Sequence, residues 1–390
     1  MGAVMDFGWS QEDQEFRARV RTFIDEHWPE GSGGWDWEEG VDRDHVKRYQ
    51  QELADRGWLT MAWPHEYGGQ DASYFQQMIF NEESVLSGAP RGGQGASLVG
   101  PTLMLFGTEE QKREHLPKIA RNEVRWAQGY SEPGAGSDLA SLQTRAVRDG
   151  DEFVINGQKI WTSGAQHADW LHVLTRTDPD APKHRGISYF MVPAKSTGIT
   201  IRPLVQITGA SEFNETFFED VRIPASNMIG EENRGWYVAA TTLDFERSGV
   251  DRTAGFRPAF ERLLEIVRDP ESGVQPKPVQ RLALADIDIE QEVARYITYR
   301  VTWMQARKLV PNYEASMSKV FGSEMIQRNA QRAVSLLGPV SVLKPGSPGA
   351  IADGLFCQVY LWAPSRTILA GTSEIQRNII ATRGLGLPRG

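Results

Sequence analysis

The sequence has little of several features, and each absence excludes a class of protein. Cys357 is its single cysteine, which excludes an intrachain disulfide framework and predicts a buried free thiol in a reducing cytoplasm. No apolar run approaches the roughly 20 residues that a membrane helix needs. The seven histidines are scattered, without the spacing that metal ligands require. We therefore expect a soluble, cytoplasmic protein that holds no metal and does not span a membrane.

Charge and length further limit the classes of protein to which the chain can belong. Lysine and arginine total 42 against 51 acidic residues, which gives a formal net charge of −9. No basic run interleaved with aromatic residues is present, so nucleic-acid binding is not expected. Residues 1–16 contain no basic segment followed by an apolar core, so no secretory signal is expected. With 390 residues, the chain is long enough for two or three domains with a large core.

Hydrophobic periodicity divides the chain into three regions. Residues 1–125 have the spacing of helices, whereas residues 126–230 change to alternating or short apolar runs rich in strand formers. Residues 231–390 return to a helical period. This order predicts an α+β protein with an N-terminal helical domain 1–125, a central β domain 126–230 and a C-terminal helical domain 231–390.

Local signals place some element boundaries. Ser10 with Asp13, and Thr108 with Gln111, form capping-box patterns at helix starts. The Gly-rich segment 88–95 interrupts a helical pattern between them. Strands are expected over residues 170–174, 187–192 and 216–218, and long helices over 284–309 and 315–337.

Small residues, turn formers and two hydroxyls are concentrated in residues 131–138, Ser-Glu-Pro-Gly-Ala-Gly-Ser-Asp. Such a loop can bring backbone N–H groups and serine oxygens close to a planar, phosphate-bearing ligand. Downstream, an Asn156-Gly157 pair between Phe153-Val154-Ile155 and Lys159-Ile160-Trp161 predicts a hairpin turn. That hairpin would hold Trp161 and Ser163 near the loop. Taken alone, the loop is equally consistent with an ordinary surface turn.

These segments together closely resemble the acyl-CoA dehydrogenase family. The resemblance covers almost the whole chain and implies a central β-barrel-like domain and a C-terminal four-helix-bundle-type domain. It also implies FAD as cofactor and the removal of two hydrogens from the α and β carbons of an acyl-CoA thioester. The segments that match in order are residues 107–112, 131–138, 156–164, 213–221 and 371–377.

The resemblance also implies which residues contact the cofactor. Ser131 is expected to hydrogen-bond the flavin ring near N5, and Ser137 is expected to reach the pyrophosphate. Trp161 and Ser163 are expected to flank the ring and the ribityl chain. The full set of expected cofactor-binding residues is Tyr130, Ser131, Gly136, Ser137, Trp161, Ser163, Thr372 and Glu374.

The reaction requires a base, because the α-proton of a thioester is only weakly acidic. Many family members carry a glutamate directly before the Gly-Thr-Ser motif, but here that position is Ala370, which offers only its backbone N–H to the thioester oxygen. A second family arrangement places the glutamate in a Leu-Asp-x-Glu-Arg helix, which Glu246 matches. We expect Glu246 to be the base, supported by Arg247. The alternative is a surface glutamate paired with Arg247 or Arg252.

Two family elements that grip the FAD of a neighbouring subunit are missing. The segment expected to carry Arg before Phe-Gly is the Pro- and Gly-containing stretch 268–277. The segment expected to carry Gln before a Gly-Gly-x-Gly turn is 335–341, where Pro339 has no N–H to donate. Because the loop 131–138 is intact, we expect an α2β2 tetramer in which a related acyl-CoA dehydrogenase subunit supplies the missing groups. This arrangement resembles actinobacterial members that act on steroid side chains.

The sequence thus predicts an FAD-dependent flavoprotein of lipid metabolism and steroid catabolism. Its substrate would be a bulky or branched acyl-CoA, and its electrons would pass to an electron-transfer flavoprotein. The small residues at 92–96 would leave volume for such an acyl group, although a plain helix break explains them equally well. The remaining alternatives are a homo-oligomer that grips the diphosphate through Lys277 or Arg281, an acyl-CoA oxidase, and a non-catalytic subunit that completes a partner's flavin site.

Overall fold

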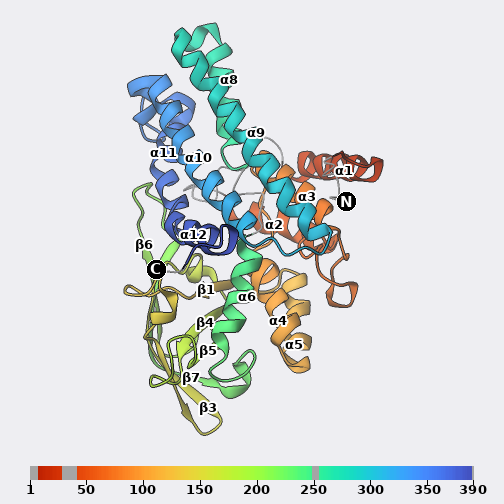
Figure 1. The fold of residues 1–390 in the computed structure, drawn as a ribbon, viewed down its shortest axis with the longest axis vertical. Coiled ribbons are helices and arrows are strands. Elements are labelled where there is room, and N and C mark those ends of the chain that lie inside the picture. Colours follow the sequence, from red (N-terminus) through yellow and green to blue (C-terminus); the bar gives the residue numbers. More distant parts are fainter. Residues whose placement is uncertain (1–7, 29–41, 248–253, 389–390) are drawn as a thin grey trace. The chain divides into compact units, whose positions relative to one another are not determined.

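The computed structural model describes residues 8–28, 42–247 and 254–388, which form two compact units (Figure 1). We call residues 36–72 and 91–246 the sheet unit, and residues 1–35, 73–90 and 247–390 the helical unit. Among the described residues, none of the helices combines the length and the apolar character needed to cross a bilayer.

One mixed sheet of seven strands forms the centre of the sheet unit. Strand β1 pairs with β4 in parallel, and β4 also pairs with β5 in antiparallel fashion. The three predicted strands are confirmed, as parts of β4, β5 and β7. The strands are β1 (Trp126–Gly129), β2 (Arg145–Asp149), β3 (Glu152–Lys159), β4 (Trp170–Arg176), β5 (Ile187–Pro193), β6 (Ile199–Leu204) and β7 (Phe213–Pro224). Six of them follow the order β1-β4-β2-β3-β7-β6, and β5 lies off this path, paired with β4.

The predicted hairpin turn at Asn156-Gly157 is wrong. Both residues lie inside β3, which pairs along its length with β7. Gly157 lies at a β-bulge, and a Cβ added to it would come within 2.5 Å of Thr144 Oγ1. Glycine is needed there because two chain segments approach closely. The hairpin instead joins β2 to β3 at Gly150, whose φ of +62° suits a tight turn after Asp149.

Helices in the sheet unit pack on the sheet through a shared core. Trp63, Val99 and Leu103 pack in one cluster with Tyr189 of β5 and Val238 of α6. In Figure 1, α6 lies beside α4 and α5, in agreement with this cluster. The predicted capping box ahead of α5 is confirmed. The helices are α2 (Arg43–Asp55), α4 (Gly100–Phe106), α5 (Glu109–Ala120) and α6 (Gly235–Arg247).

The helical unit is organised around α10, which packs against α9, α11 and α12. Helix α1 begins with the predicted capping box at Ser10, and α8 begins beside Pro258. Cys357 lies buried on α11, as predicted. The helices are α1 (Gln11–His27), α3 (Tyr74–Leu86), α8 (Arg257–Arg268), α9 (Pro278–Ala306), α10 (Tyr313–Leu337), α11 (Leu355–Arg366) and α12 (Ser373–Ile379).

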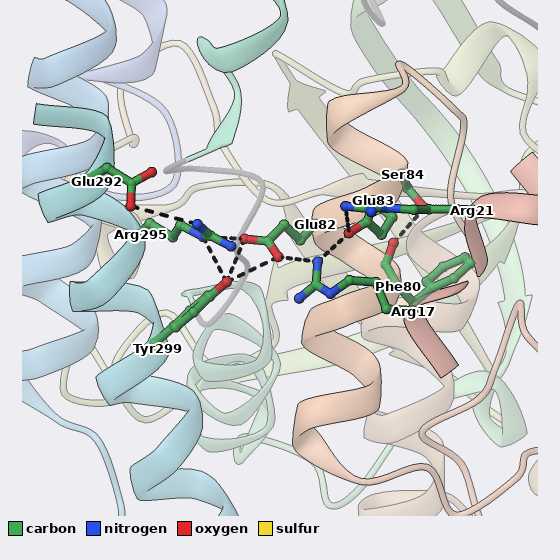
Figure 2. A network of polar contacts seen from close by, with 9 residues as sticks. All are labelled: Arg17, Arg21, Phe80, Glu82, Glu83, Ser84, Glu292, Arg295 and Tyr299. Carbon is green, nitrogen blue, oxygen red and sulfur yellow. Dashed lines mark hydrogen bonds and ion pairs between the residues drawn. The ribbon is translucent and has the colours of Figure 1, made fainter. Parts of the chain in front are cut away.

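A buried charged network ties α1, α3 and α9 together (Figure 2). Glu82 and Glu83 of α3 are almost fully buried. Glu82 accepts hydrogen bonds from Arg295 Nε and Tyr299 Oη of α9, each at 2.9 Å, and Arg17 of α1 pairs with both carboxylates. Removing one partner of such a pair leaves an uncompensated buried charge, which typically costs about 3–5 kcal/mol. The network therefore fixes how the three helices pack.

Candidate functional site

The loop 131–138 is a tight turn that follows β1. Glu132 and Ala135 exchange two backbone hydrogen bonds of 3.0 Å each, which fold the loop back on itself. A Cβ added to Gly134 or Gly136 would meet no protein atom within 4 Å. The packing of the chain therefore does not require these glycines, and their open side leaves room for a ligand to approach the backbone.

A buried ion pair holds this loop from behind. Lys159 Nζ lies 2.8 Å from Glu132 Oε1 and donates to the Tyr130 carbonyl oxygen at 3.0 Å. Glu132 also accepts the N–H groups of Gln143 and Thr144, at 2.6 and 2.8 Å. Burial lowers the pKa of Lys159 to about 8, against the opposing pull of Glu132. Burial acts to raise the pKa of Glu132, but Lys159 and the two N–H donors outweigh it and hold that pKa below its ordinary value.

The end of β3 joins the loop directly. The Ile160 N–H donates to the Ser131 carbonyl oxygen at 2.9 Å. The next residue, Trp161, has a φ of +62° and leaves 56% of its surface exposed, with its ring edge-on to Phe213. A bulky residue in the left-handed region costs about 1–3 kcal/mol and occurs mainly at functional sites. The N–H of Thr162, which follows Trp161, donates to the Asn214 carbonyl oxygen at 3.1 Å and helps to hold this conformation.

The structure thus brings six of the expected cofactor contacts into one region of the sheet unit. Tyr130 is buried, Ser131 and Ser163 are half-buried, and the others are exposed. The six residues are Tyr130, Ser131, Gly136, Ser137, Trp161 and Ser163.

This region suits a planar ligand that carries a diphosphate. Trp161 offers an exposed aromatic face, and the glycines leave the loop backbone accessible. Both carboxylates of the loop are paired, Glu132 with Lys159 at 2.8 Å and Asp138 with Lys183 at 2.6 Å, so neither leaves an uncompensated negative charge to repel phosphate. The residues present therefore fit FAD.

A second group of expected residues lies in the helical unit. Ala370 has a φ of +52°, and Gly371 follows with +84°. The Gln376 side chain donates to the Ala370 carbonyl oxygen at 3.3 Å. In the part of the chain that the structure describes, the Ala370 N–H donates to no acceptor. A strained backbone that presents a free N–H is suited to receive an oxygen that gains negative charge.

Thr372 and Glu374 form the start of α12. Thr372 Oγ1 accepts the Ile375 N–H at 3.2 Å and so caps the helix. The backbone N–H of Glu374 itself, followed by the Thr372 hydroxyl, lowers the pKa of the exposed Glu374 carboxyl. Both side chains therefore stabilise the turn that follows Ala370.

Glu246 and Arg247 are the last residues of α6. Their side chains lie outside the described residues, as does Arg252, the alternative partner of Glu246. The structure therefore assigns Glu246 to a helix, as the Leu-Asp-x-Glu-Arg pattern predicts, and leaves its expected role as base a prediction.

Neither of the two segments that depart from the family pattern is α-helical over most of its length: 268–277 includes a short 3₁₀ turn and irregular chain, and 335–341 passes from the end of α10 into the 3₁₀ helix Gly338–Val342. Helix α8 ends at Arg268, and a short 3₁₀ turn leads to α9, which begins at Pro278. Helix α10 ends at Leu337, and Gly338 follows with a φ of +72°. Lys277, one of the cations of the homo-oligomer alternative, is exposed at the start of α9.

The glycines near residue 95 serve packing. The segment Gly95–Val99 forms a π-helical turn, and a Cβ on Gly95 would lie 2.9 Å from Trp126 Cδ1. A Cβ on Gly100 would overlap the Trp63 ring, whereas Gly93 has no neighbour within 4 Å. Gly95 and Gly100 thus let helices approach tryptophan rings, and of these three glycines only Gly93 leaves open space.

Replacing Gly100 by alanine is therefore expected to lower the free energy of unfolding by about 1–3 kcal/mol, because the added methyl group must displace the Trp63 ring. Thermal unfolding would measure the loss. Gly93→Ala is the matched control and should change stability little. An equal loss in both variants would contradict this account of the packing.

Sequence reasoning assigned no role to Glu132 and Lys159, although the pair holds the loop in place. Both residues stand inside the motif segments 131–138 and 156–164. A lysine in a strand beside apolar Ile160 and Trp161 is a signal that could have been used, because a strand lysine inside a core requires a partner.

Comparison with known proteins assigns the chain to a class of flavoenzymes. Acyl-CoA dehydrogenase family models match in chain order: the N-terminal domain over residues 10–123, the middle domain over 127–221 and the C-terminal domain over 233–385. The chain belongs to the acyl-CoA dehydrogenase family and is an oxidoreductase that acts on a CH–CH group. The predicted fold, helical domain, central β domain and helical domain, is confirmed.

Individual relatives cover nearly the whole chain. Acyl-CoA dehydrogenase IpdE1 of Mycobacterium tuberculosis is 38% identical over 97% of this chain and 99% of its own. FadE26 of the same organism is 37% identical over 87% of this chain and 88% of its own. Among solved structures, the Tcur3481-Tcur3483 steroid ACAD has a TM-score of 0.88 at 36% identity, and the ChsE4-ChsE5 complex from Mycobacterium tuberculosis has 0.88 at 35%. Both structures match over 99% of this chain and 100% of theirs.

Proposed function

We propose that this acyl-CoA dehydrogenase uses FAD, acts on a bulky or branched acyl-CoA such as one with a steroid side chain, and passes electrons to an electron-transfer flavoprotein. The hydrogen bond between Ile160 and Ser131, which joins the loop to the strand end that carries Trp161, is the observation that carries the cofactor assignment. The substrate class is supported by the similarity to a protein described as a steroid ACAD.

The predicted cofactor contacts have distinct roles. Ser131 would hydrogen-bond the ring near N5, Ser137 would bind the pyrophosphate, and Trp161 with Ser163 would flank the ring and the ribityl chain. Thr372 and Glu374 would add contacts from the start of α12. When bound, FAD supplies the acceptor for the hydride that leaves the β-carbon.

The chain's own residues would control the proton. The Glu246 carboxylate would take the α-proton, while the electron pair of that C–H bond forms the new double bond between the α and β carbons. The Ala370 N–H would stabilise the negative charge that develops on the thioester oxygen, a role in which one backbone donor typically contributes about 3–4 kcal/mol. Arg247 would support Glu246. We keep residues 1–125, 126–230 and 231–390 as the proposed domains.

We also propose that the chain assembles as an α2β2 tetramer with a related acyl-CoA dehydrogenase subunit. One face of α9 supports this proposal, because it carries large apolar side chains at heptad-like spacing that are 41–70% exposed. Such a stripe suits the apolar face of a helix from another chain. These residues are Val279, Leu282, Ile289, Val293 and Tyr296.

Flavin content tests the assembly. The chain produced alone is expected to retain little FAD, because it lacks the groups that grip the diphosphate end of the cofactor. Co-expression with the related subunit should restore one FAD for each pair of chains, measured by absorbance after gel filtration. If the lone chain is fully flavinated, the homo-oligomer alternative is correct, and Lys277→Gln or Arg281→Gln should then reduce its FAD content.

Substrate and acceptor can be tested on the flavinated complex. Turnover of steroid-side-chain acyl-CoA should exceed that of linear acyl-CoA, with electron-transfer flavoprotein as acceptor. A preference for linear chains would contradict the bulky-substrate proposal. Rapid oxygen consumption with peroxide formation would identify an acyl-CoA oxidase instead.

A further inference from the structure

Three buried aromatic side chains form a polar cluster in the core of the sheet unit. His172 of β4 and Tyr189 of β5 are fully buried, and His172 Nδ1 lies 2.7 Å from Tyr189 Oη. The Tyr130 ring stands edge-on to both, with ring centroids 5.4 Å from His172 and 6.0 Å from Tyr189. Tyr130 immediately precedes Ser131, so one member of the cluster lies at the start of the loop 131–138.

The cluster continues to α6. Tyr130 and Tyr189 pack in one buried cluster with Val238 and Ala239 of α6. The hydroxyls of Tyr130 and Thr242 act to lower the pKa of the Tyr189 phenol, although burial has the larger effect and raises it. Thr242 lies on α6, one helical turn before Glu246, and is fully buried. Its hydroxyl lies 2.8 Å from the Thr102 hydroxyl of α4. One buried phenol therefore packs between the residue that precedes the loop and the helix that carries the expected base.

This polarity has an energetic cost. His172 Nε2 is buried and has no hydrogen-bond partner among the described residues, which costs about 1–3 kcal/mol. Burial lowers the pKa of His172 to about 3, so the ring is neutral at physiological pH and adds no ion pair to offset that cost. Apolar residues of similar shape would avoid the cost, but they would not fix the direction of the Tyr189 hydroxyl.

We propose that Tyr189 is a positioning residue that couples the loop 131–138 to helix α6, with His172 fixing the orientation of its hydroxyl. The proposal rests on the function proposed above. Tyr189 touches neither substrate nor reacting atoms. It acts through Tyr130, next to Ser131, and through Thr242, one turn before Glu246, so that the cofactor loop and the base-bearing helix keep one relative arrangement.

Tyr189→Phe removes only the hydroxyl and tests this role in the flavinated complex. Because small misplacements of reacting groups cost large factors in rate, kcat should fall by on the order of 10-fold or more, with KM little changed. The visible absorption band of the bound flavin should shift, and the Kd for FAD, measured by titration of the apoprotein, should rise. Tyr49→Phe, which removes another buried phenol on α2, is the control for a purely structural effect.

The proposal is overturned if Tyr189→Phe keeps kcat, flavin spectrum and Kd for FAD, or if Tyr49→Phe changes them equally. If Tyr189→Phe does not fold, variants of Thr242 test the coupling instead. Thr242→Ser keeps the hydroxyl and should retain activity, whereas Thr242→Val should reproduce the loss of kcat. Equal activity in both Thr242 variants would contradict the coupling. Failure of the proposed function would be recognised separately, because the wild-type complex would then dehydrogenate no acyl-CoA.

Discussion

Replacement of Glu246 by glutamine is expected to reduce turnover by roughly 10²–10⁴-fold, the range typical of a general base, while FAD content stays at the wild-type level. Glutamine keeps the size of the side chain but cannot take a proton. The chain offers no carboxylate at the other family position, because Ala370 stands there. Single-turnover reduction of the flavin by an acyl-CoA would measure the proton-abstraction step without interference from the electron acceptor.

Glu261→Gln provides the matched control. Glu261 is an exposed glutamate on α8 that pairs with Arg257, and its loss should leave flavin reduction unchanged. Wild-type rates in Glu246→Gln would show that Glu246 is a surface residue and that another group is the base. Inactive but flavinated Glu246→Gln complex would also exclude the alternative that this chain only completes a partner's flavin site.

Glu132→Gln is expected to lower the free energy of unfolding by about 3–5 kcal/mol, because Lys159 would remain as a buried charge without a counterion. The effect should reach the cofactor, since Lys159 also holds the Tyr130 carbonyl oxygen at the start of the loop. Thermal unfolding and FAD content would measure the two consequences. Both should decrease together.

A double variant separates the ion pair from the volume that it fills. Glu132→Gln combined with Lys159→Met removes both charges, and it should be more stable than Glu132→Gln alone. Lys183→Gln, which breaks the exposed pair with Asp138 at the end of the same loop, should cost less than about 1 kcal/mol. A double variant no more stable than the single one would contradict the role assigned to the pair.

Lowering the pH should weaken the ion pair between Glu132 and Lys159 and so lower the free energy of unfolding. The pKa of Glu132 in the folded protein lies below its ordinary value of 4.5. Its ionised form therefore contributes stability that is present above that value and is lost as pH falls through the folded-state pKa. The wild type should lose more stability than the double variant over this acidic range.

The sequence predicted elements well where the signal was local. Helix starts at Ser10 and Thr108 followed from capping boxes, because the side chains that satisfy the first N–H groups lie within three residues. The prediction of the hairpin turn failed because Gly150-Asp151 and Asn156-Gly157 are similar as turn signals. Tertiary packing decided between them: Gly157 is required by Thr144, which lies on a different segment.

In the candidate site, too, the sequence predicted the local motifs but not the contacts that depend on the fold. The loop 131–138 and Trp161 stand out from composition and spacing, and the bond from Ile160 to Ser131 joins them. The partnership of Glu132 with Lys159 could not be read from spacing, since it depends on which strand passes behind the loop. The Tyr189 cluster was likewise hidden, because its members come from four separate elements or their ends.

The exposed stripe on α9 has a consequence for the chain before it is assembled. A newly made chain without that cover displays a long row of apolar side chains, the kind of surface that chaperones and proteases bind in unassembled subunits. Under the proposed assembly, the amount of this chain in a cell would then follow the amount of its partner, and synthesis in excess would be lost to degradation. The stripe would thus set the ratio of the two subunits in the cell as well as the contact between them.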